Sequence, residues 1–154
     1  MNHYQRSLML DAEPATVYAA LTTPAGLRGW WTQDCDVATV IGETSRFRFG
    51  RHHKTMLVEQ LDCGREVRWL CTAAHIAAPE LTRPDEWVGT RIVFRLTAQE
   101  AGRTRVDFEH VGLVPELECF GMCSRGWNYF LESLQAFVQT GHGTPYAIEQ
   151  AVAA

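Results

Sequence analysis

The chain has 154 residues, of which 46% are hydrophobic and 10% aromatic, and its formal net charge at pH 7 is −4. This length and apolar content suit one globular domain with a substantial core and exclude a largely disordered chain. The negative charge supplies no overall positive field, which argues against nucleic acid or an anionic membrane surface as a partner.

The first part of the chain predicts one strand followed by two short helices. His3–Leu10 has the pattern of a strand. Pro14 marks the start of a short helix, because proline at a first helical position sacrifices no hydrogen bond. Pro24 interrupts this helix, and a second short helix carries Trp30 and Trp31.

The middle of the chain alternates apolar and polar residues with a period of two, which indicates strands separated by short turns. The predicted strands are Val37–Ile41, Ser45–Gly50, Thr55–Leu61, Glu66–Ala73, Trp87–Thr97 and Arg103–Val111. With the first strand they make about seven. Consecutive strands joined by short turns predict an antiparallel meander.

The alternation also separates two faces of this sheet. One row is apolar and aromatic, comprising Val67, Trp69, Cys71, Ile92, Phe94, Leu96, Val106, Phe108 and His110. The opposite row is charged, comprising Arg91, Arg95, Arg103, Arg105, Asp107 and Glu109. An antiparallel sheet that faces water on one side must bury its other side against another element.

A long C-terminal helix is the element able to cover the apolar face. Apolar residues recur every three or four positions between Leu117 and Thr140, and Gly141 and Pro145 form a stop signal. The expected fold is therefore α+β: a curved antiparallel sheet of about six or seven strands that grips a long C-terminal helix. We expect one domain over residues 1–146 and a loosely ordered tail over residues 147–154.

Local strings strengthen this prediction. PATVYAALTTPAGLRGWW, IGETSRFRFG, WVGTRIVFRLT, TRVDFEHVGL and GWNYFLESLQAFVQTGHGTPY resemble, in order, the family named after the activator of the heat-shock-protein ATPase. That family lies within the START/Bet v-like (SRPBCC) superfamily of helix-grip proteins. The resemblance spans nearly the whole chain, and it implies an apolar cavity between sheet and helix.

A small hydrophobic molecule, lipid-like or aromatic, is therefore the expected partner, and no cofactor is expected. Any single buried ring is more often ordinary core packing, but the resemblance favours a cavity for the set. The candidate ligand-binding residues are Trp30, Trp31, Phe47, Phe49, Trp69, Trp87, Phe94, Phe108, His110, Phe120, Cys123, Trp127, Phe130 and Leu131.

Catalytic and metal chemistry have weaker support. His110 is the one ionisable residue on the inward row of its strand and is a weak candidate for an acid or base, since no carboxylate can be paired with it from sequence. Cys119 and Cys123 share a helix face but supply only half of a tetrahedral metal site, so buried packing is favoured and no metal is expected.

Two alternative functions stay open: a cyclase- or hydrolase-type enzyme acting in the same cavity, and a co-chaperone-like module that binds a chaperone or a second copy of the chain. The five cysteines contain no CxxC pair, which favours reduced thiols over a disulfide framework. The N-terminus has no secretory pattern, and no window approaches the ~18 apolar residues of a membrane span, so a cytoplasmic location is expected.

Overall fold

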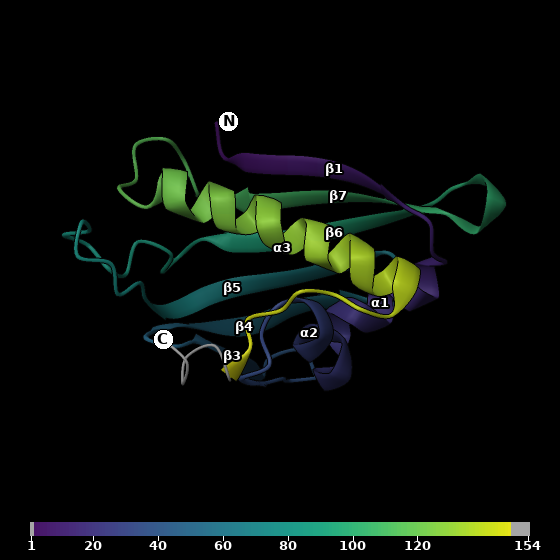
Figure 1. Ribbon diagram of the computed structural model, residues 1–154, viewed down its shortest axis with the longest axis horizontal. Coiled ribbons are helices and arrows are strands. Elements are labelled where there is room, and N and C mark those ends of the chain that lie inside the picture. The colour runs from purple at the N-terminus through teal and green to yellow at the C-terminus, as the bar shows by residue number, and fades with distance from the viewer. Residues whose placement is uncertain (1, 149–154) are drawn as a thin grey trace.

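Seven strands form one antiparallel sheet in the computed structural model, which describes residues 2–148, and a long helix lies across one face of this sheet (Figure 1). The elements in chain order are β1 (Tyr4–Leu10), α1 (Pro14–Thr22), α2 (Pro24–Trp30), β2 (Cys35–Asp36), β3 (Thr44–Phe49), β4 (His52–Asp62), β5 (Glu66–His75), β6 (Arg91–Ala98), a 3-10 turn η1 (Glu100–Gly102), β7 (Thr104–Val111) and α3 (Phe120–Thr140).

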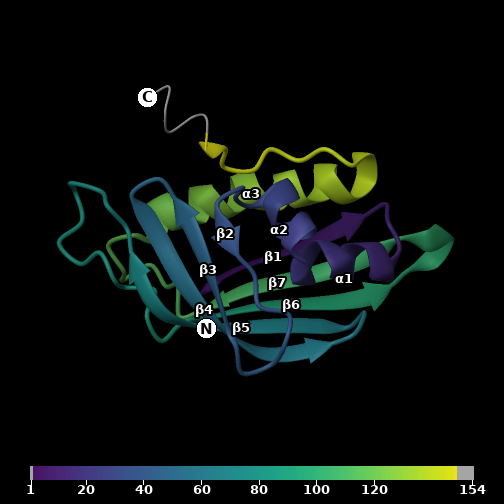
Figure 2. The same cartoon turned by 90° about the horizontal axis from the view of Figure 1, so that it is seen from below.

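The strand order β1-β7-β6-β5-β4-β3-β2 confirms the predicted meander, with β1 added beside β7. Figure 2 shows that the sheet curves and that all three helices lie on its inner side. The predicted apolar row is buried and faces these helices. The fold is the predicted α+β helix grip. One face of this antiparallel sheet is exposed to solvent, and α3 packs against the other, apolar face.

Helix α3 begins three residues later than predicted and ends where predicted. The chain before Phe120 forms turns, in which the Leu117 amide donates to Val114 and the Phe120 amide donates to Leu117. Gly141 has a φ of 87°, the left-handed conformation that favours glycine, and its amide donates to the Phe137 carbonyl at 2.8 Å. The left-handed glycine therefore ends the helix.

The predicted strand Val37–Ile41 is wrong, since the pairing with β3 ends at Asp36. The Ala38 amide takes the Ser45 hydroxyl as its acceptor at 2.9 Å in place of a strand carbonyl. Val40 and Ile41 are then about half exposed in the connecting loop. A side chain competing for a backbone amide is a known way for serine to end regular structure.

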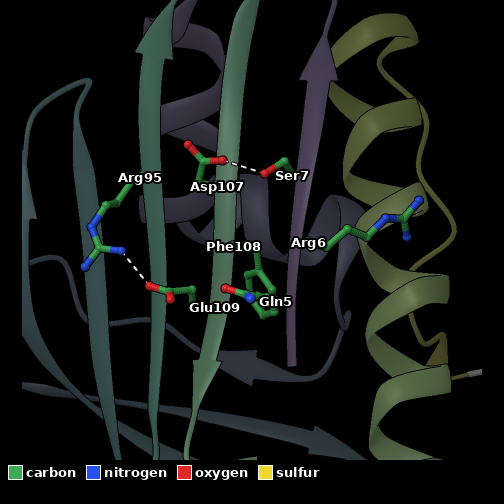
Figure 3. Close-up of a pocket in the computed structure, with 7 residues that line it drawn as sticks. All are labelled: Gln5, Arg6, Ser7, Arg95, Asp107, Phe108 and Glu109. Atoms are coloured by element: carbon green, nitrogen blue, oxygen red, sulfur yellow. Dashed lines mark hydrogen bonds and ion pairs between the residues drawn. The ribbon is translucent and has the colours of Figure 1, made fainter. Parts of the chain in front are cut away.

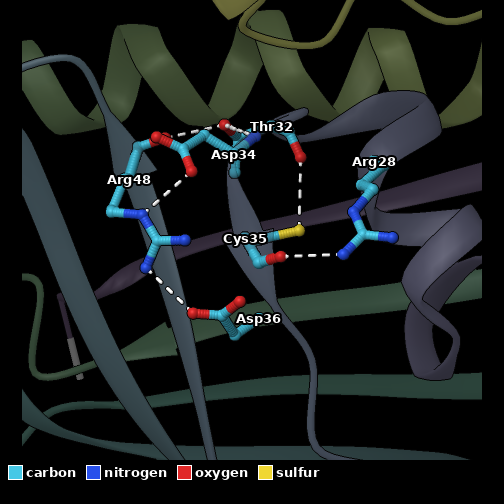
Figure 4. Close-up of polar contacts among 6 residues, drawn as sticks. All are labelled: Arg28, Thr32, Asp34, Cys35, Asp36 and Arg48. Carbon is cyan, nitrogen blue, oxygen red and sulfur yellow. Dashed lines mark hydrogen bonds and ion pairs between the residues drawn. The ribbon is translucent and has the colours of Figure 1, made fainter.

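Polar contacts hold β2 at its place on the sheet edge. Arg48 of β3 donates from Nε to Asp34 at 2.9 Å and from Nη1 to Asp36 at 3.1 Å (Figure 4). Arg28 of α2 donates to the Cys35 carbonyl at 3.0 Å. These two hydrogen-bonding aspartates raise the pKa of Arg48 above its ordinary value. The network joins α2, β2 and β3 into one unit.

Among the other predicted strand boundaries, two changes affect the candidate site. Strand β4 begins at His52 rather than Thr55, because Gly50 (φ 67°) and Arg51 form a tight turn that carries the β3–β4 ladder directly into His52. Strand β6 begins at Arg91 rather than Trp87. The segment before it is a turn, in which the Thr90 amide donates to the Trp87 carbonyl at 2.9 Å.

Helices α1 and α2 meet at Gly26 with no room for a side chain. A Cβ atom at this position would lie 2.6 Å from the Ala19 carbonyl oxygen and 2.6 Å from the Ala20 Cα, both backbone atoms that cannot rotate away. We expect Gly26→Ala to lower the free energy of unfolding by about 1–3 kcal/mol through overpacking, measured by urea denaturation.

The control for this prediction is Gly126→Ala in α3, where a Cβ atom meets nothing within 4 Å. That change is expected to be neutral or stabilising, because alanine favours the helix by up to about 1 kcal/mol over glycine. Equal stability of Gly26→Ala and the unmodified chain would contradict the close helix contact.

No helix within residues 2–148 combines the length and the apolar character needed to cross a membrane. Of the tail predicted over residues 147–154, only Ala147 and Ile148 are described, and the remaining residues lie outside the described range.

Candidate functional site

A cluster of aromatic rings fills the middle of the grip between the sheet and α3. Trp31 lies at its centre. The distances from its ring centroid to those of neighbouring rings are 4.4 Å (Phe47), 5.4 Å (Trp127), 5.7 Å (Trp30) and 5.9 Å (Trp69). These five side chains are at most 2% exposed. In this region the rings pack against one another as a filled core.

A cavity of about 410 Å³ opens beside this cluster, against the N-terminal half of α3. Its lining is Phe49, His52, Lys54, Ile76, Met122, Cys123, Gly126, Phe130 and Tyr146. A smaller hollow of about 50 Å³ is lined by Trp31, Lys54, Trp87, Cys123, Gly126, Trp127 and Phe130. The two share Lys54, Cys123, Gly126 and Phe130, so the small hollow extends the cavity towards the tryptophan cluster.

Lys54 is the one lysine of the chain, and its side chain lines both hollows. It pairs with Phe47 across the β3–β4 ladder and therefore belongs to the inward row of its strand. Its Nζ lies 4.3 Å from the Trp87 ring centroid and 4.6 Å from the Phe49 centroid, within cation–π range. Desolvation by burial lowers the pKa of the ammonium group.

The Cys123 thiol forms part of the same wall. Trp87 donates from Nε1 to Cys123 Sγ at 3.1 Å. A hydrogen bond from Cys119, assisted by Trp87 and Lys54, lowers the pKa of Cys123, and the same pairing raises the pKa of Cys119. The two thiols predicted to share a helix face are therefore adjacent, with Cys123 bordering the cavity and Cys119 fully buried.

His110 lies behind the cavity in a closed hydrogen-bond network. Trp127 Nε1–H can only donate, so His110 Nδ1 accepts at 3.0 Å and the ring proton is on Nε2. His110 Nε2–H then donates to the Thr90 hydroxyl at 2.8 Å, and that hydroxyl donates to the Trp87 carbonyl at 2.6 Å. Burial lowers the pKa of His110 to about 3, so the ring is neutral and both nitrogens are occupied.

The C-terminal segment supplies the rim of the cavity. After α3 the chain returns to form a parallel bridge between Tyr146 and Thr32, with the Tyr146 amide donating to the Trp31 carbonyl at 2.9 Å. This backbone pairing sets the Tyr146 ring edge-on to Phe49 at 6.0 Å. On β4, His52 Nδ1 accepts the Ala77 amide at 2.9 Å.

A second hollow on the β1–β7 side of the sheet has a different character (Figure 3). Its charged groups are already paired: Arg95 donates to Glu109 at 2.6 Å, and Ser7 donates to Asp107 at 2.6 Å. Hydrogen bonds from Ser7 to Asp107, and from His3 and Arg95 to Glu109, lower the pKa values of both carboxyls. A surface whose polar groups satisfy one another offers little to a ligand, so the apolar cavity is the better candidate site.

The candidate residues from sequence divide into three groups. Six line the cavity or its extension: Trp31, Phe49, Trp87, Cys123, Trp127 and Phe130. Seven lie in the core behind it: Trp30, Phe47, Trp69, Phe94, Phe108, His110 and Leu131. Phe120, the first residue of α3, is partly buried against the core and does not line the cavity.

Sequence reasoning missed His52, Lys54, Ile76, Met122, Gly126 and Tyr146. Two signals were available. Lys54 alternates with Met56 and Val58, so it belongs to an inward row, and Met122, Gly126 and Phe130 follow one another at a spacing of four on α3. Ile76 directly follows β5 and Tyr146 lies beyond the end of α3, so both fall outside the predicted strand and helix. Within residues 2–148, no three His, Cys, Asp or Glu side chains form a group that could hold a metal ion.

Comparisons with known proteins agree with this architecture. The family model "Activator of Hsp90 ATPase homolog 1-like protein" matches residues 11–139. The Aha1 dimer from Colwellia psychrerythraea, solved in solution, is 32% identical, with a TM-score of 0.78 over 93% of this chain and 100% of that one. A search of curated proteins found no match.

More distant structures share the fold. Protein MLL2253 from Mesorhizobium loti is 20% identical, with a TM-score of 0.69 over 86% of this chain and 94% of that one. Protein CV1439 from Chromobacterium violaceum is 19% identical, with a TM-score of 0.66 over 90% and 97% of the two chains. At this identity the likeness concerns the fold alone.

Proposed function

We propose that this chain, which belongs to the family of activator of Hsp90 ATPase homolog 1-like proteins, binds a small hydrophobic molecule in the cavity beside Phe49, Gly126 and Phe130. The main observation in support of ligand binding is the cavity itself. Its volume of about 410 Å³ falls in the range typical of small-molecule sites, and its lining is mostly apolar and aromatic.

Helix α3 supports this proposal by the way it opens the cavity. Met122, Gly126 and Phe130 form one row along the helix, and the middle member has no side chain. A Cβ atom at Gly126 would meet nothing within 4 Å, so the space above this glycine is open. Glycine in a helix interior weakens the helix, and here it leaves room for a ligand against the helix backbone.

The test of this proposal is to fill the space above Gly126 with a larger side chain at that position. N-phenyl-1-naphthylamine, an uncharged aromatic dye that fluoresces in apolar surroundings, serves as the probe. We expect the unmodified chain to bind the dye with saturable fluorescence, and Gly126→Leu to weaken its affinity at least tenfold, because the leucine side chain occupies the cavity. Leucine is a strong helix former, so the variant should fold.

The matched control is Gly121→Leu on the same helix. Gly121 is exposed and does not line the cavity. Dye affinity should be unchanged in this variant. Absence of dye binding to the unmodified chain, or equal binding to the chain and to Gly126→Leu, would reject the cavity as the binding site.

An enzyme of the cyclase or hydrolase type has less support. Such an enzyme needs a positioned acid or base, for example His110 hydrogen-bonded to a buried carboxylate inside an open cavity. Among residues 2–148, the hydrogen-bond partners of the His110 ring are Trp127 and Thr90. With both nitrogens occupied by these partners, the ring has no free position for proton transfer to a ligand.

Association with a second copy of the chain is the second candidate, favoured by one observation. The similar Colwellia psychrerythraea protein is described as a dimer, and the likeness covers 93% of the present chain. The adjacent and half-exposed Val40 and Ile41 offer apolar contact area. This function and ligand binding are compatible, because these two residues do not line the cavity.

A further inference from the structure

We infer that the ligand of this cavity is an amphipathic organic acid, whose carboxylate pairs with Lys54 while its apolar body lies against α3. This inference rests on the proposed function and adds the chemical class of the ligand. The basis is a cation, Lys54, that lines an apolar cavity without a carboxylate counter-ion.

Lys54 has no carboxylate partner in the part of the chain that the structure describes. No carboxylate oxygen of residues 2–148 lies within 4.0 Å of its Nζ, and no hydrogen bond from this group is found there. Arginines elsewhere on the sheet differ: Arg91 lies 2.9 Å from Glu59, and Arg95 lies 2.6 Å from Glu109. Lys54 is therefore a half-buried cation that lines the cavity without a carboxylate partner.

The rings around Lys54 hold the ammonium group in position without replacing an anion. The centroids of Trp87 and Phe49 lie 4.3 Å and 4.6 Å from Nζ. Ring faces attract a cation, but the attraction is modest, and burial of a charge remains costly until an opposite charge compensates it. A ligand carboxylate at this point would form a charge-assisted hydrogen bond, which is shorter and stronger than a neutral one.

His52 provides a second donor on the same strand. Its Nδ1 accepts the Ala77 amide, so the proton of the neutral ring is on Nε2. Burial, followed by the neighbouring Lys54 and His75, lowers the pKa of His52, which keeps the ring neutral near pH 7. Lys54 and His52 both line the cavity, and between them they offer an ammonium and an imidazole N–H to an anion.

The rest of the lining suits an apolar body. Phe49, Ile76, Met122 and Phe130 carry no charge, and methionine adapts its shape to different ligands. A molecule with one anionic end and a hydrocarbon or aromatic body matches this division. A zwitterion or a polyanion would leave charges unpaired against these side chains.

The test compares decanoate with 1-decanol as competitors of N-phenyl-1-naphthylamine at pH 7, where the acid is ionised. For the unmodified chain we expect decanoate to displace the dye at roughly tenfold lower concentration than decanol, as a charge-assisted hydrogen bond predicts. Lys54→Met keeps the length and the apolar stem of the side chain, and it should abolish this preference, measured in each variant as the ratio of the decanol and decanoate concentrations that displace half of the dye.

Arg51→Met is the matched control, because it makes the same change of net charge at an exposed turn residue outside the cavity. It should retain the preference for decanoate. Lys54→Gln provides a second neutral variant if the methionine variant folds poorly, as judged by circular dichroism.

The outcomes separate the two proposals. If the dye and both competitors bind and the ratio of decanoate to decanol is the same in Lys54→Met as in the unmodified chain, the organic acid is rejected while the hydrophobic site stands. If the dye does not bind the unmodified chain, the hydrophobic site is rejected and the organic acid with it.

Discussion

We expect Trp127→Ala to lower the free energy of unfolding by about 3–5 kcal/mol, the range for truncating a large buried aromatic side chain. The Trp127 ring is 2% exposed and packs on Phe108 at 4.5 Å and on Trp31 at 5.4 Å between ring centroids. Truncation would leave a void among these rings. It would also leave His110 Nδ1 without its donor, and an unsatisfied buried acceptor adds its own cost.

Guanidinium chloride denaturation at pH 7.5 measures this effect, with Trp127→Phe as the control. Phenylalanine retains part of the ring packing but cannot donate to His110, so its loss should be clearly smaller than that of alanine. If Trp127→Ala costs less than about 1 kcal/mol while dye uptake falls, Trp127 acts as a cavity wall rather than as a core ring.

The second large effect is a loss of stability on mild acidification, caused by His110. Burial lowers the pKa of this ring to about 3 from its ordinary value of 6.5. The unfolded chain therefore binds more protons than the folded chain between these two pH values, so the stabilisation is fully present above pH 6.5 and is lost as pH falls towards 3. Between pH 6.5 and pH 5 the loss is about 2 kcal/mol, at ~1.36 kcal/mol per pH unit.

His110→Gln isolates this contribution. The variant is expected to be less stable than the unmodified chain at pH 7.5 and to lose less stability between pH 7.5 and pH 5. His52 has a lowered pKa and contributes in the same direction, but it is present in both proteins and cancels in the comparison. Parallel stability curves for the two proteins over this range would contradict a neutral buried His110.

The pH range also keeps acidic residues out of the comparison. Hydrogen bonds from Ser7 and His3 lower the pKa values of Asp107 and Glu109, whose ordinary values are 3.8 and 4.5. A carboxyl with a lowered pKa loses its stabilising contribution as pH falls below the unfolded value. Measurements that stop at pH 5 therefore report mainly on histidines.

Local chemistry predicted most of the fold correctly. The alternation in Glu66–Ala73 identified the buried faces of Val67, Trp69 and Cys71, because strand side chains point to opposite faces in turn. The prediction failed where local rules compete. Ser45 captures the Ala38 amide and ends β2 early, and the tight turn after Gly50 lengthens β4 to include His52 and Lys54.

The same rules of strand periodicity could have predicted part of the candidate site. The row Lys54, Met56 and Val58 follows from a strand period of two once β4 is known to begin at His52. A charged residue on an inward row is an exception to the binary pattern, and such exceptions are a signal for function. The prediction of Thr55 as the strand start removed Lys54 from that row.

The sequence by itself determined that an apolar sheet face and a long amphipathic helix must meet, because each needs a partner for its buried side. Tertiary structure alone decided how the space between them is divided. Trp31, Trp69 and Trp127 stack into a filled core, whereas Gly126, the residue before Trp127, has no side chain and leaves a cavity beside that core. Ile76 and Tyr146 complete the lining of that cavity, and both lie just beyond the ends of β5 and α3, outside the segments whose periodicity predicts their buried faces.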